Sequence, residues 1–329
     1  MIAFVRATRR QRGFTLTELM VALVLGALVV LAATAMVVTS RGTYRTQDES
    51  TRVQESSRFA LELVNRLVRL AGYTDFGDST QLVPAFYSAD STWSTSDSYA
   101  LNGPNLVGAD NASPTGAGIN GSDSLTIRFF GSGTSVAADG NVLDCAGSSV
   151  PAPAGSAAAY STSRAYNVLF VGYDPDNEPS LKCQRQTYDA AGNPSGLPGD
   201  TQTLIRGVES FQVLYGEANY SGGDPDLVPP TSLTYRTGIG GVNPVVNWSN
   251  VVTVRIAMLI RSNVGAQVDT TARTYDLFGV GYPNSGTDIG AQFPLAGVTL
   301  STSERTRIRR VVETTIFVRN RVAQWPDLN

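Results

Sequence analysis

The sequence contains no histidine, two cysteines and, among its 25 basic residues, a single lysine, Lys182. Without histidine the chain lacks the commonest general base of enzymes and the commonest metal ligand of proteins. It also contains no GxSxG, P-loop or dinucleotide-binding fingerprint. We therefore predict no enzyme activity, no cofactor and no metal site. The formal net charge is −3, so no overall attraction draws the chain to nucleic acid.

One long apolar run lies near the start of the chain. Residues 14–38 carry a single charge, Glu18. A helix of about 25 residues is roughly 37 Å long, enough to cross a ~30 Å hydrocarbon core. The run is too long for a cleavable secretory signal, whose apolar part has about 7 to 15 residues. A plain membrane anchor would explain neither Gly13 nor the cost of a carboxylate in an apolar span.

The junction before this run carries a more specific signal. It follows a short basic leader with Arg6, Arg9, Arg10 and Arg12, and it reads Arg12-Gly13-Phe14-Thr15-Leu16-Thr17-Glu18. This resembles the type IV prepilin signal, which has a glycine before the cut, a phenylalanine after it and a glutamate at the fifth mature position. The resemblance implies that a prepilin peptidase cleaves between Gly13 and Phe14 on the cytoplasmic side and methylates the new amino terminus.

The same resemblance gives Glu18 a partner. Cleavage would leave a positively charged amine on Phe14, and in a bundle of such helices Glu18 can pair with the Phe14 amine of a neighbour. An unpaired carboxylate is expensive in apolar surroundings, so this salt bridge favours assembly of the helices.

The helix is predicted to continue beyond the apolar run and to end at Gly72. Its second half carries an apolar stripe with spacings of three and four, made of Ala60, Leu63, Val64, Leu67, Leu70 and Ala71. We therefore divide the chain into a cleaved leader (1–13), a transmembrane and assembly helix (14–38), an amphipathic continuation (39–72) and a globular β-rich domain (73–329).

Six segments of the last part alternate in the way that is typical of half-buried, mainly antiparallel strands: 125–130, 166–173, 181–187, 204–215, 251–260 and 311–318. Residues 73–124 and 131–164 are rich in glycine, serine and aspartate, and we predict long surface loops there. The predicted fold is α+β and type IV pilin-like, with the long helix packed on one face of an antiparallel sheet.

Four body segments, 123–131, 204–216, 251–261 and 310–320, resemble the PilW family of minor type IV pilins. The layout is also similar to the J-type minor pseudopilin of type II secretion. The resemblance implies a minor subunit that helps to initiate pilus assembly in a tip or priming complex. The alternatives are a minor pseudopilin at the tip of a type II secretion pseudopilus, or a filament-displayed module for adhesion or DNA binding.

The implied partners are other minor pilins, the major pilin, a tip adhesin, the prepilin peptidase and the inner membrane. We expect no nucleic-acid partner in the preferred interpretation. The basic leader predicts a cytoplasmic amino terminus and a periplasmic body that later reaches the pilus on the cell surface.

In an exported chain two cysteines are expected to form one disulfide, so we predict a Cys145–Cys183 bond that closes a loop of about 39 residues. The alternatives are a metal site, for which further ligands are lacking, and a reactive thiol.

Two further signals are weaker. Residues 174–178 begin like a calcium-binding EF-hand loop, but Pro179 and Arg185 occupy positions that require glycine and glutamate, so we predict a polar turn, and we interpret residues 224–226 in the same way. Six arginines cluster near the carboxyl end: Arg305, Arg307, Arg309, Arg310, Arg319 and Arg321. We predict that they form the solvated face and flanks of a terminal strand. The alternative is a docking patch for another subunit or for DNA.

Overall fold

The structure is a computed structural model. It describes residues 13–73, 104–134, 137–152, 164–188, 194–220, 231–266, 271, 273–295 and 301–320. The chain forms two compact units, residues 1–48 and 49–329. The leader arginines, residues 224–226 and Arg321 lie outside the described residues. So do residues 74–103 of the loop predicted at 73–124, and residues 135–136 and 153–163 of the loop predicted at 131–164.

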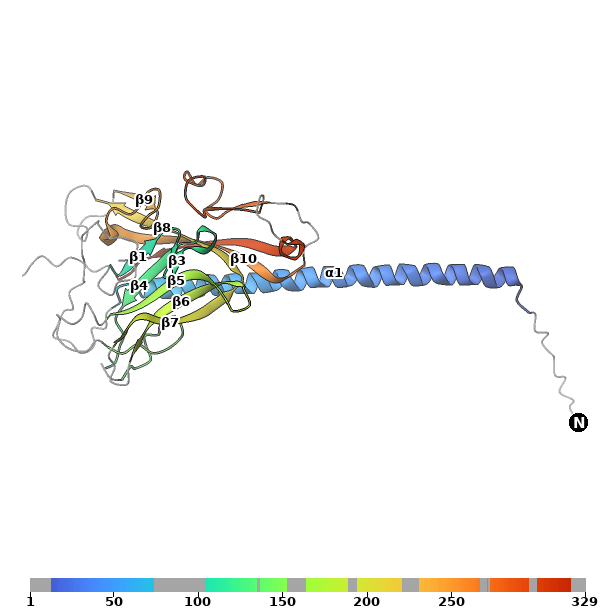
Figure 1. Ribbon diagram of the computed structural model, residues 1–329, viewed down its shortest axis with the longest axis horizontal. Coiled ribbons are helices and arrows are strands. Elements are labelled where there is room, and N and C mark those ends of the chain that lie inside the picture. Colours follow the sequence, from blue (N-terminus) through green and yellow to red (C-terminus); the bar gives the residue numbers. More distant parts are fainter. Residues whose placement is uncertain are drawn as a thin grey trace, which may run out of the picture. The chain divides into compact units, whose positions relative to one another are not determined.

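A single α-helix, α1 (Leu16–Arg69), contributes to both units (Figure 1). Its first part is apolar and long enough to span a membrane, and its most apolar stretch buries no residue within the chain's own fold. Threonine hydroxyls along this part donate to main-chain oxygens one turn earlier, for example Thr34 to Val30 at 3.0 Å and Thr39 to Ala35 at 2.9 Å. These polar groups therefore need no outside partner.

The last part of α1, from Glu49 onward, belongs to the second unit and buries one stripe. The buried residues are Glu49, Val53, Ser57, Ala60, Val64, Leu67 and Val68. The helix ends as predicted near Gly72, which has a φ of 69° and whose N–H donates to the oxygen of Arg128 at 2.9 Å. A side chain at Gly72 would lie 2.4 Å from the main-chain oxygen of Asn320, so the position requires glycine.

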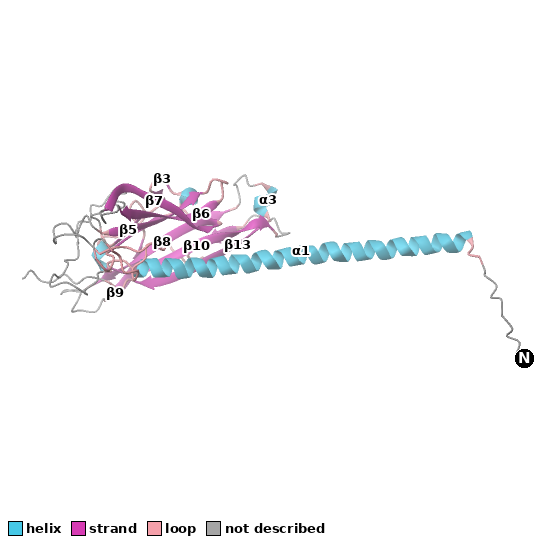
Figure 2. Ribbon diagram, turned by 90° about the horizontal axis from the view of Figure 1, so that it is seen from below, coloured by secondary structure: helices cyan, strands magenta, loops and turns pink. Residues whose placement is uncertain are grey.

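Two antiparallel sheets complete the second unit (Figure 2). The five-stranded sheet contains, in spatial order, β1 (Leu106–Ala109), β4 (Ser124–Phe129), β5 (Ala165–Tyr173), β6 (Pro179–Tyr188) and β7 (Pro194–Arg206). The four-stranded sheet contains β13 (Arg307–Phe317), β10 (Val251–Gly265), β8 (Val208–Asn219) and β9 (Ser232–Arg236).

Among the described residues, the smaller elements are two short strand pairs and three short helical segments. They are β2 (Ala112–Ser113), β3 (Gly116–Ala117), β11 (Thr274–Asp276), β12 (Gln292–Pro294), the 3-10 turns η2 (Ile119–Gly121) and η4 (Trp248–Asn250), and the helix α3 (Thr302–Arg305).

The main core joins the last part of α1 to both sheets. Leu67 from the helix, Leu169 from β5 and Ile256 from β10 all belong to one buried apolar cluster and have no exposed surface. The predicted α+β fold, with the apolar stripe packed on antiparallel strands, is therefore confirmed. Five predicted strand segments lie in β4, β5, β6, β10 and β13.

The sixth predicted segment, 204–215, is two strands that belong to different sheets. Gly207, with a φ of 80°, separates β7 from β8. Its oxygen accepts from the N–H of Arg261 at 2.8 Å, and a side chain there would lie 2.6 Å from the oxygen of Arg261. The prediction of one strand was wrong because a glycine that allows positive φ turns the chain from one sheet to the other.

The predicted loops were wrong in part. All four residues of β1 are buried, and in the second loop Val142 and Val150 are 2% exposed and join the main core. The expectation of a one-sided sheet also needs correction. On the other face of the four-stranded sheet, Leu214 and Ala257 are covered by residues 277–293, including Leu277 and Phe278.

Candidate assembly site

The described chain begins with Gly13, and Phe14 is 86% exposed. The helix starts at a reciprocal pair of hydrogen bonds. The hydroxyl of Thr15 accepts from the N–H of Glu18 at 3.3 Å, and the Glu18 carboxylate accepts from the N–H of Thr15 at 3.2 Å. This is a capping box, in which a threonine and a glutamate three residues later satisfy main-chain groups that a helix start leaves unpaired.

Sequence reasoning missed this role, although its signal, Thr-x-x-Glu before an apolar run, was present. The capping box turns the Glu18 carboxylate back toward the amino-terminal end of the helix, where it accepts from Thr15. The proposed charge partner, a free amine on Phe14, would arise at that same end. Within one chain the carboxylate accepts only from Thr15 among the described residues, so it has capacity for a further donor.

The surface that follows is apolar and uncovered. Exposed fractions of large side chains include 58% for Leu28, 70% for Leu31 and 77% for Met36. At Gly26 and Gly42 no atom lies within 4 Å of the place that a Cβ would take. Small residues of this kind let a second helix approach closely in a membrane. The arrangement fits burial in lipid or against other apolar helices.

In the second unit, the carboxyl-terminal arginines are partly structural. The guanidinium of Arg309 binds both carboxylate oxygens of Glu209, with Nε to Oε2 at 2.6 Å and Nη2 to Oε1 at 2.9 Å. The side chains of Arg309 and Glu209 are 0% and 4% exposed. Arg261 also reaches Glu209 at 2.9 Å, and burial opposes its charge, but hydrogen bonds and the two nearby glutamates raise its pKa overall.

The second glutamate of this network is Glu178. It binds Arg261 at 3.0 Å and Arg307 at 2.9 Å. The prediction that all of these arginines are solvated was therefore wrong for Arg307 and Arg309, because glutamates from β8 and the β5–β6 turn neutralise them. The docking alternative loses these two members, whereas Arg305, Arg310 and Arg319 are exposed.

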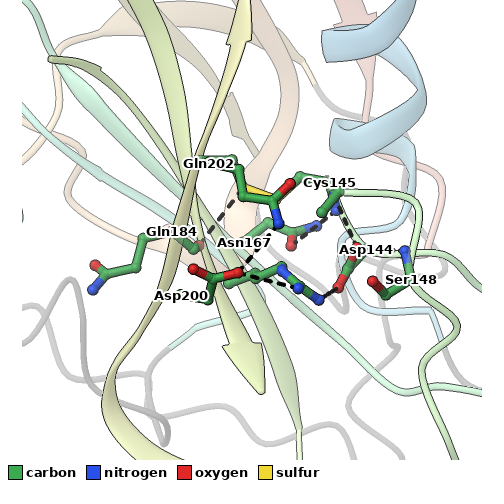
Figure 3. Close-up of a disulfide and its surroundings, with 10 residues drawn as sticks. Asp144, Cys145, Ser148, Asn167, Gln184, Asp200 and Gln202 are labelled. Atoms are coloured by element: carbon green, nitrogen blue, oxygen red, sulfur yellow. Dashed lines mark hydrogen bonds and ion pairs between the residues drawn. A yellow bond between two sulfur atoms is a disulfide. The ribbon is translucent and has the colours of Figure 1, made fainter. Parts of the chain in front are cut away.

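The two cysteines form the predicted disulfide (Figure 3). Their Cα atoms lie 6.4 Å apart, and the bond ties residues 137–152 to β6. The N–H of Cys145 donates to the side-chain oxygen of Asn167 at 3.3 Å. Beside it Asp144 binds Arg185 at 2.6 Å. The disulfide and the ion pair together hold this loop against the five-stranded sheet.

In the predicted polar turn at 174–178, the carboxylate of Asp174 accepts hydrogen bonds from other side chains of the same chain. The Asp174 carboxylate accepts from Ser180 at 2.9 Å and Thr203 at 2.5 Å, and it also binds Lys182 and Arg206. Burial opposes its charge, but these hydrogen bonds lower the pKa of Asp174 to about 2. In the part of the chain that the structure describes, no cluster of acidic or cysteine side chains has the geometry of a metal site.

Burial raises the pKa values of three other carboxyl groups, those of Asp110, Asp123 and Asp288. Burial, followed by the charge of Asp110 and a hydrogen bond with it, raises the pKa of Asp123 well above its ordinary value. Burial also raises the pKa of Asp288 to about 6, although the hydroxyl of Tyr282 donates to it at 2.7 Å. No local sequence signal marks these residues, because they meet only through the folding of distant segments.

Comparisons with known proteins agree with this geometry. Residues 168–320 match the family model of type IV pilus-assembly protein W, and residues 8–34 match that of the prokaryotic N-terminal methylation motif. No curated protein matches the chain significantly in sequence.

A solved structure, a type IV-like pilin TTHA1219 from Thermus thermophilus, is 12% identical, with a TM-score of 0.41 over 82% of this chain and 98% of that one. The methylation motif covers the start of α1, and the match to type IV pilus-assembly protein W covers strands of both sheets. The two matches support a type IV minor pilin of the PilW family.

Proposed function

We propose that this chain is a minor type IV pilin that helps to initiate pilus assembly and lies in the tip or priming complex. The prepilin peptidase cuts between Gly13 and Phe14 and methylates the new amino terminus. Glu18 then pairs with the Phe14 amine of a neighbouring subunit. The pilin family is structural, and the chain offers no catalytic motif, so assembly is the activity proposed.

The single observation that carries this proposal is the exposed apolar surface of the first part of α1. Its first part exposes a continuous apolar surface, with one carboxylate at the amino-terminal end that has unused acceptor capacity. A surface of this size costs free energy in water unless something covers it. Lipid covers it before assembly, and neighbouring pilin helices cover it in the filament.

The location follows from the same features. The chain crosses the inner membrane once, with its amino terminus in the cytoplasm and the second unit in the periplasm, and later moves to the pilus. Its partners are other minor pilins, the major pilin, a tip adhesin and the prepilin peptidase. The body of the chain, residues 49–329, is large for a subunit repeated along a whole fibre, which supports a place at the tip.

Mass spectrometry of sheared surface filaments tests the proposal. We expect an amino-terminal peptide that begins at N-methylated Phe14, and far fewer copies of this chain than of the main fibre subunit. We also expect a deletion strain to carry fewer filaments. An uncut leader would contradict the proposed processing, and a copy number equal to that of the main subunit would contradict the place at the tip. Normal piliation without the chain would contradict the role in initiation.

A further inference from the structure

A cleft of about 520 Å³ lies on the outer face of the four-stranded sheet, and the assembly role does not use it. Leu214 of β8 is buried beneath it. The edge strand β9, labelled in Figure 1, supplies Leu233 and Tyr235 on one side. Residues 278–284 form the other side. Pockets of this volume are the usual size for sites that bind small molecules.

The two sides are held in place before any ligand arrives. Leu233 leans over Gly216 of the neighbouring strand, where a Cβ would lie 3.2 Å from its side chain. Opposite, the rings of Phe278 and Tyr282 meet edge to face with centroids 5.3 Å apart. The Tyr282 hydroxyl is fixed by Asp288 at 2.7 Å. A rigid site loses little conformational entropy on binding.

The lining combines apolar faces with neutral polar groups. Leu233 and Tyr235 are 42% and 37% exposed, so both remain available to a ligand. Asn243 uses its side-chain oxygen to accept from Arg236 at 2.9 Å, while its NH₂ group has no partner among the described residues. Thr234 and Asn284 add further neutral groups. A ligand that fits must offer both an apolar face and hydrogen-bonding groups.

The charge of the cleft excludes ionic ligands. Arg255 is the one charged side chain among the described lining residues, and it is already engaged. Its guanidinium lies over the ring of Phe278 at 5.4 Å and binds Glu313 at 2.9 Å. A phosphate would have to break this pair, and a bare charge would lose its hydration beside aromatic rings. A purely apolar ligand would leave the amide of Asn243 unpaired, which also costs free energy.

We propose that this cleft binds a neutral carbohydrate. A sugar ring has an apolar C–H face that can lie on Tyr235 and a rim of hydroxyl groups that both donate and accept hydrogen bonds. This matches the side-chain amides of Asn243 and Asn284 in the lining. A proline-rich peptide also carries apolar faces, but its main chain provides acceptors almost alone. The inference is independent of the assembly role, since binding is a property of the isolated chain.

The test is saturation-transfer NMR on the purified full chain in lauryldimethylamine oxide micelles, a detergent without a sugar headgroup. The probes are maltotriose, chitotriose and lactose, with decaproline as the competing ligand class. We expect at least one oligosaccharide to bind. Tyr235→Ala should weaken it about tenfold, and Tyr235→Phe, which keeps the ring, should stay within about threefold.

Val280→Ala is the matched control, because Val280 is 90% exposed and outside the lining. It should bind like the unaltered chain, and melting curves should show that all variants fold. Three results would each overturn the inference: no oligosaccharide binds, decaproline alone binds, or Tyr235→Ala binds the oligosaccharide as well as the unaltered chain.

Discussion

The apolar side chains of α1 are exposed in the first unit, whereas one stripe of them is buried in the second, although the helix contributes to both units. In the first unit Leu28 is 58% exposed, and nearby apolar side chains such as Leu25 are exposed to a similar degree. In the second unit Val64 and Leu67 of the same helix have no exposed surface. The second unit therefore covers its apolar side chains with its own fold, whereas the first unit does not. We therefore expect folding to depend on the last part of α1 and assembly to depend on its first part.

The charged residues repeat this contrast. Among the described residues, the Glu18 side chain accepts hydrogen bonds only from Thr15, and it is exposed. Glu209 is 4% exposed at its side chain and is neutralised by Arg309 and Arg261. Substitutions in the second unit should therefore change stability, and substitutions in the first should change assembly.

The largest effect is expected from Glu209→Ala. It would leave Arg309, whose side chain is fully buried, without its carboxylate. Breaking a buried ion pair in this way costs about 3–5 kcal/mol of the free energy of unfolding. Glu313→Ala is the matched control, because Glu313 is 49% exposed at its side chain and its pair with Arg255 contributes about 0–1 kcal/mol. Denaturant unfolding of the full chain measures both, and equal losses would contradict the contrast.

Leu67→Ala should have the next largest effect. It removes a fully buried side chain from the core between the helix and the sheets and should cost on the order of 3 kcal/mol. The same change in the first unit, Leu28→Ala, should leave unfolding of the body unchanged within about 0.5 kcal/mol, because Leu28 has no cover to lose. A comparable loss for Leu28→Ala would show that the first unit is covered by the chain itself.

A smaller effect concerns pH and sharpens the description of the second unit. Burial raises the pKa of Asp288 to about 6, so the folded chain holds a proton there that the unfolded chain has released. This contribution to stability is present below pH 4 and is lost as the pH rises to about 6. Asp288→Asn should remove this loss, on the order of 1 kcal/mol, while keeping an acceptor for Tyr282. Unfolding measured from pH 4 to 7 should be flatter for the variant, and identical slopes would contradict the assignment.

We expect the smallest of these effects from Asp174, with the opposite dependence on pH. Its folded pKa of about 2 lies below the ordinary value, because hydrogen bonds from Thr203 and Ser180 outweigh its burial. Its contribution is therefore complete above pH 4 and is lost as the pH falls toward 2. Asp174→Asn should reduce the steepness of acid unfolding below pH 4, and an unchanged acid limb would contradict this.

Much of the fold could be predicted because its signals are local. The helix stripe around Val64 and Leu67 repeats every three or four residues, and Gly72 marks its end. Strands such as β10 can be predicted from their runs of β-branched and aliphatic residues. β1 was missed because a short strand buried on both faces shows no alternation.

The rest of the site depends on contacts between distant residues. Glu209 and Arg309 are 100 positions apart, and no spacing rule joins them. The disulfide could be predicted since only two cysteines exist. The sequence also contains the capping-box pattern at Thr15 and Glu18. The sequence prediction assigned Glu18 only to a charge partner and not to this cap.

The capping role of Glu18 and its proposed role in assembly can be separated, and this tests the central claim most directly. Glu18→Gln keeps the capping box, because glutamine also accepts from the N–H of Thr15, but it removes the charge. The measurement compares the amount of this variant in the membrane and in sheared filaments. We predict an unchanged amount in the membrane and about tenfold less in the filaments, because a buried amine would lose its carboxylate. Equal amounts in both fractions would show that assembly does not depend on the charge of Glu18.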